Sequence, residues 1–567
     1  VVKDGQAASA GHTTAEGYTA VSVESLAATG AASILLGGTR SGAGAAVAVD
    51  TVSDRVRVET NVQANELLLT ATRKVEVAGG VTVAAAGAAD ASAGQLNLTG
   101  DGALLRVSNR TGVDIVRTGV SRAAGFGDLE VGANAKLIGA QVDVDATGNL
   151  SLDSTAALAT DVFSLGAGRI SFGGASPEGD SVVIDGALLA TLGGASSLSL
   201  RSYSTIDFLD GLNLALVGDG RLVLDAPGLR GLGDATDQVN LSAGEVLLRN
   251  STGGVLTASG MGTLHIEARP PLRDGVTGGI EIGAGSQSLG FDNVTLVSTG
   301  DLTFSGTGQL KTQGNLDLAA ERVTGATGAD QAVTAAGVLS VSRPGDGHTL
   351  SERVGLGAKL ALAGQRVVHN GAIDLPGGQL AITALNAANA AYGVEFGAGS
   401  ITRAGGFSAT TPDGWQVFGD AGSIAVTAKQ GAIKVDGVIG VAARAGGGSG
   451  GQLTFSATGS QGALELGDAA VLEGAAGRDE AGNAGKGGAF TADLQSLPDD
   501  VGVSTDGLDG LARATADFTH GFDLRVRSGN VALAAQRVKA ETVLIAADAG
   551  SLTVTSTIDA SASQGGV

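Results

Sequence analysis

The sequence predicts an all-β protein, a right-handed parallel β-helix (solenoid) built from many short strands with loop excursions. Three observations predict this fold: a short alternation of apolar and polar residues, a glycine that repeatedly precedes it, and a composition suited to a thin core. The 567 residues include 94 Gly, 8 Pro and only 3% aromatic residues, although 43% of them are hydrophobic. Since most of the apolar residues are Ala, Val, Leu and Ile, few are large enough to fill a wide core.

One five-residue phrase carries the strand signal. It reads Gly, a small or polar residue, an aliphatic residue, a small or polar residue, then an aliphatic residue or Phe. Apolar side chains at alternate positions are typical of a strand with one buried face. The phrase occurs at Gly94–Leu98, Gly148–Leu152, Gly262–Ile266, Gly300–Phe304, Gly314–Leu318, Gly378–Ile382, Gly422–Val426, Gly431–Val435, Gly451–Phe455, Gly462–Leu466, Gly529–Leu533 and Gly550–Val554.

The spacing of these phrases indicates a repeat. Gly431 and Gly451 are 20 residues apart, and Gly529 and Gly550 are 21 apart, which fits a unit of 20–21 residues holding two short strands. A β-sandwich array, the structural alternative, would need longer strands and recurring hairpin turns. Parallel crossovers favour the right-handed form. Shorter strands without the full phrase are expected at Val142–Val144, Phe163–Leu165, Ile170–Phe172, Val182–Ile184, Leu198–Leu200, Ile206–Phe208 and Leu222–Leu224.

Four stretches interrupt the sequence repeat. We otherwise interpret the chain as one continuous domain, residues 1–567. In the longest, Leu497–Gly521, residues Asp509–Phe518 could form two or three helical turns, with Leu511, Ala514 and Phe518 along one face. We expect this stretch to leave the repeat as a surface excursion, because loops are tolerated there. The other interruptions are Arg269–Thr277, Arg343–Ala358 and Arg403–Asp420.

Charge and cysteine content exclude several functions. The formal net charge is −22 and the pI about 4.6, which argues against binding nucleic acid and against docking on anionic lipid. The chain has no Cys, so it has no disulfides or thiolate metal sites. The stretch Val77–Ala89 is too short to span a membrane, and we expect no membrane insertion. The first residues do not resemble a signal peptide, so we interpret the sequence as an excerpt from a longer polypeptide.

Several phrases resemble a known family. They are similar to stretches of the filamentous haemagglutinin-type large exoproteins, which Gram-negative bacteria export across the outer membrane by two-partner secretion. The resemblance spans nearly the entire chain and implies a β-helical shaft region, surface display and a role in cell adhesion. The phrases are Ser33–Ser41, Gly100–Asn109, Gly166–Gly173, Leu200–Phe208, Val323–Asp330 and Leu524–Gly566.

The resemblance also implies a location and partners. The protein would be secreted and displayed at the cell surface. One partner would be the outer-membrane two-partner secretion transporter, engaged through a domain absent from this sequence, since no Asn-Pro pair occurs. The other would be a surface ligand on a host or neighbouring cell, for which carbohydrate is one option. The sequence has no Arg-Gly-Asp tripeptide, which leaves integrin binding by that route unsupported.

The sequence offers few residues for chemistry. The five histidines are isolated, although His348 and His369 are 21 residues apart and could stack. Gly447–Gly451 matches G-x-S-x-G but lies within a run of glycines, where a corner is the better interpretation. Gly485–Gly487 lacks the remaining features of a phosphate-binding loop. The other three histidines, His12, His265 and His520, are interpreted as structural or solvated.

Polysaccharide-cleaving β-helices are the enzyme alternative. Arg269–Arg273 resembles the R-x-P-x-x-R motif of pectate lyases but is one residue short, and Asp499–Asp500 lacks the companion motifs of polygalacturonases. Asp506–Gly510 is a faint calcium candidate, for which a solvated acidic loop is preferred. We therefore predict no catalytic, cofactor-binding or metal-binding residues and no cofactor. The favoured function is a non-catalytic shaft segment of an adhesin or contact-mediating exoprotein. The alternatives are a self-assembling extracellular sheath or matrix protein and a β-helical carbohydrate-active enzyme.

Overall fold

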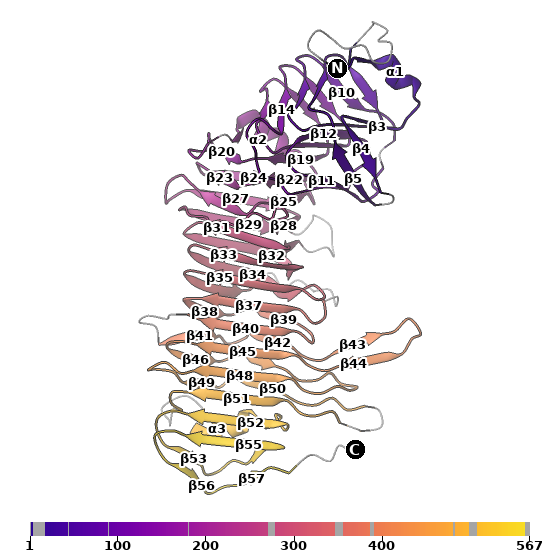
Figure 1. Ribbon diagram of the computed structural model, residues 1–567. Coiled ribbons are helices and arrows are strands. Elements are labelled where there is room, and N and C mark those ends of the chain that lie inside the picture. Colours follow the sequence, from indigo (N-terminus) through magenta and orange to yellow (C-terminus); the bar gives the residue numbers. More distant parts are fainter. Residues whose placement is uncertain are drawn as a thin grey trace. The chain divides into compact units, whose positions relative to one another are not determined.

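The computed structural model describes residues 2–3, 18–42, 45–88, 90–179, 181–269, 278–345, 355–385, 391–479, 482, 484–497 and 507–561. Of the described residues, 54% lie in strands or bridges and 4% in helices, so the prediction of an all-β protein is confirmed (Figure 1). Most strand pairings are parallel. The chain divides into two compact units, one of residues 1–276 with 285–291 and one of residues 277–284 with 292–567.

The first unit contains several sheets. One main row is β3 (Ser33–Leu36), β8 (Glu66–Ala71), β12 (Ala103–Ser108), β16 (Gln141–Ala146), β19 (Val162–Ala167), β22 (Ser197–Ser202), β25 (Arg221–Asp225) and β28 (Glu245–Arg249). A second row is β21 (Val182–Ile184), β20 (Ile170–Phe172), β23 (Thr205–Phe208), β26 (Gly228–Gly231) and β31 (Gly285–Gly290). A third is β24 (Leu212–Ala215), β27 (Gln238–Ala243) and β29 (Thr263–Ala268).

Smaller sheets complete this unit. One contains β1 (Val2–Lys3), β2 (Val21–Ser22), β6 (Arg55–Val58), β9 (Lys74–Val77), β14 (Asp128–Val131) and β17 (Leu150–Leu152). Another contains β7 (Val62–Ala64), β10 (Thr82–Ala85), β15 (Lys136–Ile138) and β18 (Ala157–Ala159). The last, here called the cover sheet, contains β4 (Gly38–Ser41), β5 (Ala46–Thr51), β11 (Gly94–Thr99) and β13 (Val113–Thr118).

The cover sheet departs from the simple parallel repeat that the sequence predicts. Strand β12 lies antiparallel between β8 and β16, and its outer face packs against the cover sheet through an apolar cluster that includes Leu68, Leu98 and Leu104. The outer face of this row is therefore buried as well as the inner one. Charged side chains that point outward from the row, Arg106 and Asp143 among them, are consequently buried.

The second unit is built from three rows of parallel strands. The first row is β33 (Thr307–Thr312), β35 (Asp330–Ala335), β37 (Lys359–Gly364), β40 (Gln379–Ala384), β45 (Ser423–Ala428), β48 (Gln452–Ala457), β51 (Ala489–Leu494), β52 (Gly521–Val526) and β55 (Thr542–Ala547). The second is β32 (Asn293–Phe304), β34 (Asn315–Gly325), β36 (Val338–Ser342), β38 (Arg366–His369), β41 (Tyr392–Phe396), β46 (Ala432–Val435) and β49 (Leu464–Leu466).

The third row begins with β30 (Gly279–Ile282) and continues through the carboxyl-terminal parts of the long strands β32 and β34. It then passes through β39 (Ala372–Asp374), β42 (Ile401–Arg403), β47 (Val438–Gly440) and β50 (Val471–Glu473). Near its carboxyl-terminal end, the unit also pairs β53 (Val531–Leu533) with β56 (Leu552–Val554), and β54 (Val538–Lys539) with β57 (Ile558–Asp559).

Residues in register stack into ladders, and the inward ladders form the core. In the first row Leu380, Ile424, Leu453 and Phe490 are consecutive partners and are all buried. Phe490 stacks on Phe522 of the next strand with ring centroids 5.6 Å apart. Alternate residues face outward, as the two-residue period predicts. Aliphatic residues with a few Phe stacks thus fill a narrow core, in agreement with the composition.

The repeat is less regular than 20–21 residues. Lys359 pairs with Gln379, 20 residues on, whereas Gln379 pairs with Ser423, 44 residues on. Part of the longer interval is a hairpin, β43 (Phe407–Thr410) and β44 (Gln416–Gly419), which projects from the stacked strands (Figure 1). The predicted excursion at Arg403–Asp420 therefore contains a β-hairpin, with Trp415 near its tip and 75% exposed.

The recurring glycine has a steric explanation. Gly378, Gly422 and Gly451 each precede a strand of the first row. The carbonyl of Gly378 accepts a hydrogen bond from the N–H of Ser423, and a Cβ on Gly422 would collide with that carbonyl oxygen. Gly451 stands in the same relation to the carbonyl of Gly422. The phrase therefore begins with Gly because successive corners lie directly on one another.

Within the described ranges, three short helices interrupt the strands: α1 (Val23–Ala28), α2 (Gly186–Gly193) and α3 (Gly507–Ala514). The first two lie outside residues 497–521, the only stretch in which the sequence predicts a helix. Helix α3 lies within it, and Leu511 and Phe518 are buried while Ala514 is half-buried. The phenyl ring of Phe518 meets that of Phe490 at 5.9 Å, so the described part of this stretch packs on the sheet. Among the described residues, no helix has the length and apolar character needed to cross a membrane.

Candidate functional site

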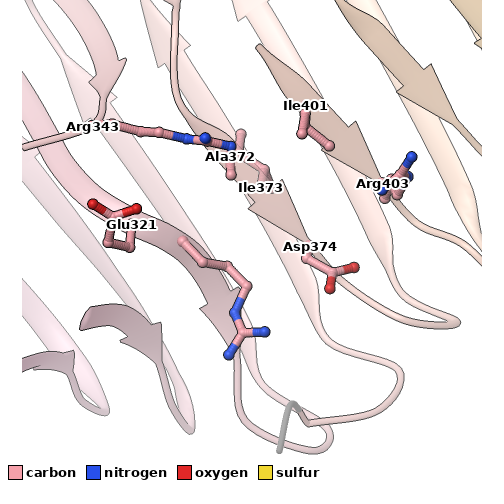
Figure 2. A pocket seen from close by; sticks show the side chains of 8 residues that line it. Glu321, Arg343, Ala372, Ile373, Asp374, Ile401 and Arg403 are labelled. Carbon is pink, nitrogen blue, oxygen red and sulfur yellow. The ribbon is translucent and has the colours of Figure 1, made fainter. Parts of the chain in front are cut away.

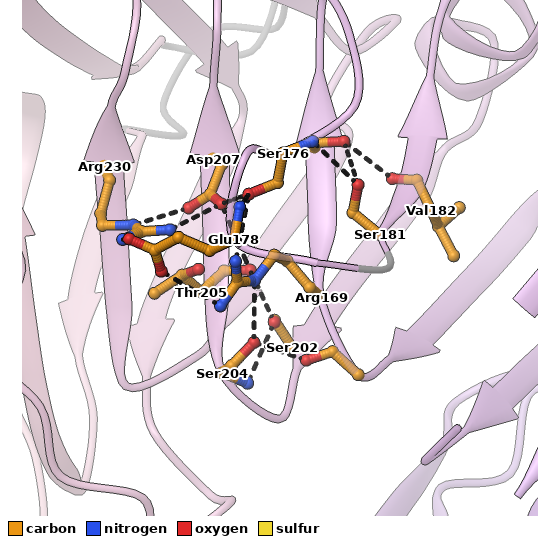
Figure 3. Close-up of polar contacts among 12 residues, drawn as sticks. Arg169, Ser176, Glu178, Ser181, Val182, Ser202, Ser204, Thr205, Asp207 and Arg230 are labelled. Atoms are coloured by element: carbon orange, nitrogen blue, oxygen red, sulfur yellow. Dashed lines mark hydrogen bonds and ion pairs between the residues drawn. The ribbon is translucent and has the colours of Figure 1, made fainter. Parts of the chain in front are cut away.

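A cluster of charged side chains in the first unit lies beside a cavity of about 540 Å³, which its members Arg169 and Ser176 line. Arg230 donates to both carboxylate oxygens of Asp207, each at 2.8 Å, and to Glu178 at 2.6 Å. Ser176 also donates to Asp207, at 2.7 Å, and Arg169 donates to Ser176 at 3.1 Å (Figure 3). Burial alone would raise the pKa of Asp207, but the hydrogen bonds from Arg230 and Ser176 hold it below its usual value.

This cluster has a structural role. Its two arginines and two acids satisfy one another, and Ser176 and Glu178 come from the loop between β20 and β21, whereas Asp207 and Arg230 come from β23 and β26. The contacts tie the loop to two neighbouring strands. A fully satisfied network of this kind adds rigidity and leaves few groups for a ligand.

A second polar region, in the second unit, is different. Two cavities of about 350 and 600 Å³ share Arg322, Asp374 and Arg403 as lining residues. We call the region the arginine groove and define it by Glu321, Arg322, Arg343, Asp374, Arg403, Arg444 and Glu473. Figure 2 shows Glu321, Arg343, Asp374 and Arg403 around the smaller of the two cavities.

The third row of strands positions these residues. Asp374, Arg403, Gly440 and Glu473 are consecutive partners on β39, β42, β47 and β50. The residues before them, such as Ile373 and Ile439, point inward and are buried, so the ladder of polar residues faces outward. Small residues lie beside it on the larger cavity: Gly405, Gly406, Gly440, Ala442 and Ala443.

Two of the arginines have carboxylate partners. Arg322 donates to both oxygens of Asp301, at 2.9 and 2.7 Å. Arg403 reaches across Gly440 to Glu473, with both hydrogen bonds at 3.3 Å. The absence of a side chain at Gly440 permits this reach, because a Cβ there would lie 2.6 Å from a Glu473 oxygen.

Other groups in the arginine groove have no such partner. Among the described residues, the guanidinium groups of Arg343 and Arg444 form no hydrogen bond or ion pair, and both residues are exposed. Oε1 of Glu321 is buried without a hydrogen-bond partner in the described part of the chain, and the residue is only 8% exposed. Burial raises the pKa of Asp374, against the opposing effect of Arg322 and Arg403. The groove thus combines free donors with free acceptors.

The five histidines do not form a site in the described structure. His265 lies in register with Asn240. His520 contacts Glu541, with Nδ1 to Oε2 at 2.7 Å. His369 is fully buried against Phe396. His12 and His348 lie outside the described residues, and so does any stacking of His348 on His369. No group of three or more metal-ligating side chains occurs in the part of the chain that the structure describes.

The remaining motifs have structural surroundings. Within Gly447–Gly451, the N–H of Ser449 donates to Asp420 and its hydroxyl accepts from the backbone N–H of Lys486. Lys486 therefore belongs to a corner as well. Asp509, from the calcium candidate Asp506–Gly510, accepts from the backbone N–H groups of Ala534, Ala535 and Gln536.

Of the lyase-like motif, only Arg269 lies within the described residues, and it contacts Glu267 and Ser242. Asp499 and Asp500 lie outside them, as does Asp506. The described structure therefore places none of the motif candidates in the arginine groove. Sequence reasoning missed the groove because its residues are widely spaced and match no motif. The signal that existed was a charged residue at the end of three short strands, Ala372–Asp374, Ile401–Arg403 and Val471–Glu473.

Comparison with known proteins gives no assignment: no family model, no curated protein and no solved structure matches this chain.

Proposed function

We propose that the three rows of the second unit are the faces of a right-handed parallel β-helix. We also propose that the chain is a non-catalytic shaft segment of a secreted, surface-displayed adhesin or contact-mediating exoprotein. The parallel register of successive strands supports the fold, together with the strong bias of parallel crossovers toward the right-handed form. The resemblance to filamentous haemagglutinin-type exoproteins supports the cellular role, including export through an outer-membrane transporter that recognises another domain.

The observation that carries a binding role is the unused polar capacity of the arginine groove. Arg343, Arg444 and Asp374 line the two cavities without pairing with one another. Asp374 lies on strand β39 and Arg343 directly follows β36, so the fold fixes the backbone of these groups before a ligand binds, which lowers the cost of ordering them. A ligand on a host or neighbouring cell would bind along this face.

The adhesive role can be tested with beads that carry the chain. We expect such beads to attach to cultured epithelial cells more than albumin-coated beads do. Beads carrying the double variant Arg403→Gln/Arg444→Gln should attach less than beads carrying the unaltered chain. Arg525→Gln, which removes an exposed arginine paired with Asp548 elsewhere in the unit, is the control and should leave attachment unchanged. Attachment no greater than that of albumin would contradict the proposal.

A further inference from the structure

We propose that the arginine groove binds a glycan whose sugar residues carry carboxylate groups, that is, a chain containing uronic acids. This inference rests on the proposed binding role and specifies the ligand class. It starts from the charges that the groove leaves unpaired. A guanidinium and a carboxylate make paired, charge-assisted hydrogen bonds, so Arg343 and Arg444 are matched to carboxylate groups on a ligand.

The free acceptors require a ligand with donors as well. Asp374 has no hydrogen bond to its carboxylate among the described residues, and it lines both cavities. An acceptor that a ligand covers without supplying a donor is costly, and sugar hydroxyl groups supply donors. A ligand with both carboxylates and hydroxyls satisfies both kinds of group, whereas a neutral sugar leaves the arginines unpaired.

The charge balance disfavours polymers of higher charge density. The groove contains four arginines, but Glu321, Asp374 and Glu473 lie among them and Asp301 pairs with Arg322. The whole chain carries a net charge of −22. A sulfated or phosphorylated polymer would meet these carboxylates at close range, where like charges repel. A glycan with one carboxylate per sugar places fewer negative charges along the same length.

The groove is shaped for an extended chain. Asp374, Arg403, Gly440 and Glu473 occupy four successive strands of one ladder, and neighbouring strands are about 4.8 Å apart. This repeat is comparable to the length of one pyranose residue in an extended glycan. Gly405, Gly406 and Gly440 keep the surface beside the ladder free of bulky side chains, so successive sugars can lie along it.

Isothermal titration of the full chain with an oligogalacturonate tests the proposal. We expect saturable binding that Arg444→Gln weakens about tenfold, the effect of losing one charge-assisted hydrogen-bonded pair. Arg221→Gln is the control, because Arg221 is also an exposed arginine whose side chain pairs with no other described residue, and it lies in the first unit. Its affinity should equal that of the unaltered chain.

Asp374→Ala separates recognition of a sugar from general attraction of anions. If Asp374 accepts a sugar hydroxyl, the substitution weakens oligogalacturonate binding. If the groove only attracts negative charge, the loss of a carboxylate strengthens binding, and the proposal is overturned. The proposal is also overturned if hexaglutamate binds as tightly as the oligogalacturonate, because this peptide carries carboxylates but no hydroxyl groups.

Other outcomes distinguish this inference from the function on which it rests. Binding of a neutral or sulfated oligosaccharide that depends on Arg444, with no binding of oligogalacturonate, overturns the ligand class and supports the groove as an adhesive site. Bead attachment that is insensitive to Arg403→Gln/Arg444→Gln, together with oligogalacturonate binding in solution, supports the ligand class and contradicts the adhesive role. Cleavage of the oligogalacturonate that Asp374→Ala abolishes contradicts a purely binding role.

Discussion

At the corner before β45, Gly422 has no room for a side chain. Its added Cβ would collide with the carbonyl oxygen of Gly378, which already accepts the N–H of Ser423. Relief would require the backbone of two corners to separate, so we expect Gly422→Ala to lower the free energy of unfolding by about 3 kcal/mol or more. Urea unfolding followed by circular dichroism would measure it.

Gly521 provides the matched control, since it begins strand β52 of the same row. A Cβ there would meet Thr542 at 3.4 Å and Ala489 at 3.5 Å, which is ordinary contact. Gly521→Ala should therefore change stability by less than about 1 kcal/mol. Equal effects of the two substitutions would show that corner stacking does not explain the recurring glycine.

His369 makes the core sensitive to acid. The ring is fully buried, lies edge-on to Phe396 at 5.7 Å, and makes no hydrogen bond of good geometry in the described structure. Burial lowers its pKa from 6.5 to about 4. The unfolded chain therefore binds this proton more readily, and stability is fully present above about pH 6.5 and is lost as the pH falls toward 4.

The loss attributable to His369 is about 2–3 kcal/mol between pH 7.5 and 4.5, because each pKa unit corresponds to about 1.4 kcal/mol. We expect His369→Leu to remove this part of the pH dependence, and to be relatively more stable in acid than the unaltered chain. Urea unfolding of both proteins at the two pH values measures the difference. Parallel pH profiles for the two proteins would contradict the expectation.

At the scale of elements, strand β12 shows that charged side chains need charged partners when both faces of a sheet are buried. Arg106 donates to Asp143 and Glu66, each at 2.8 Å, while Asp143 is buried and burial raises its pKa. Arg106→Leu leaves the Asp143 carboxylate without this cation, so we expect a loss of about 3–5 kcal/mol. The double variant Arg106→Leu/Asp143→Leu should recover much of it, as measured by urea unfolding.

An exposed ion pair supplies the comparison for β12. Arg525 and Asp548 pair at 2.8 Å in solvent-accessible positions, and exposed pairs contribute little to stability. Arg525→Leu should therefore have a small effect. If Arg106→Leu is equally mild, or if the double variant is no more stable than the single one, the buried pair does not stabilise the pairing of β12 with its neighbours.

The carboxylate of Asp509 links helix α3 to the backbone of residues 534–536. The backbone N–H groups of Ala534, Ala535 and Gln536 donate to Asp509, and they lower its pKa although burial alone would raise it. We expect Asp509→Ala to accelerate tryptic cleavage after Arg513, in the same helix, roughly tenfold, because local opening becomes easier by about 1 to 2 kcal/mol. Mass spectrometry of early fragments would detect it. Asp468→Ala, at an exposed acid of the same unit, should leave the rate unchanged.

The sequence predicted the repeated elements better than their surroundings. The phrases at Gly378–Ile382, Gly422–Val426 and Gly451–Phe455 coincide with the corners and first residues of β40, β45 and β48, because glycine and alternating aliphatic residues respond to purely local geometry. The alternation at Val142–Val144 also placed the valines inward. It could not show that Asp143 is buried, since the covering strands β11 and β13 precede it in a separate stretch of chain.

The arginine groove was hidden for a related reason. Arg403 and Glu473 are 70 residues apart in sequence, and Gly440 lies between them in register. Their alignment depends on the unequal lengths of the intervening excursions, one of which is the hairpin β43–β44. A fixed period of 20–21 residues does not predict which outward residues become neighbours. Register between distant strands therefore decided the candidate site, and local pattern did not reveal it.

At the scale of the whole molecule, net charge and local charge act in opposite directions. The chain carries −22 overall, so it repels other acidic surfaces at a distance. The arginine groove, by contrast, offers cations at short range. Salt screens this long-range repulsion, and the screening length is about 10 Å at 0.1 M ionic strength. The repulsion slows association more than it weakens the bound complex. The proposed adhesive role therefore predicts two distinct effects of ionic strength.

The first effect concerns attachment and the second concerns the groove. Raising the ionic strength from about 10 to 150 mM shortens the screening length from about 30 to 8 Å, so beads carrying the chain should attach faster to negatively charged cells. The ratio of oligogalacturonate affinities between the unaltered chain and Arg444→Gln should fall over the same range, because long-range repulsion is nearly common to both proteins and only the screened local attraction differs. Attachment that slows with added salt would mean that the acidic surface does not govern approach. An affinity ratio that stays constant or rises would mean that Arg444 acts through structure rather than through its charge.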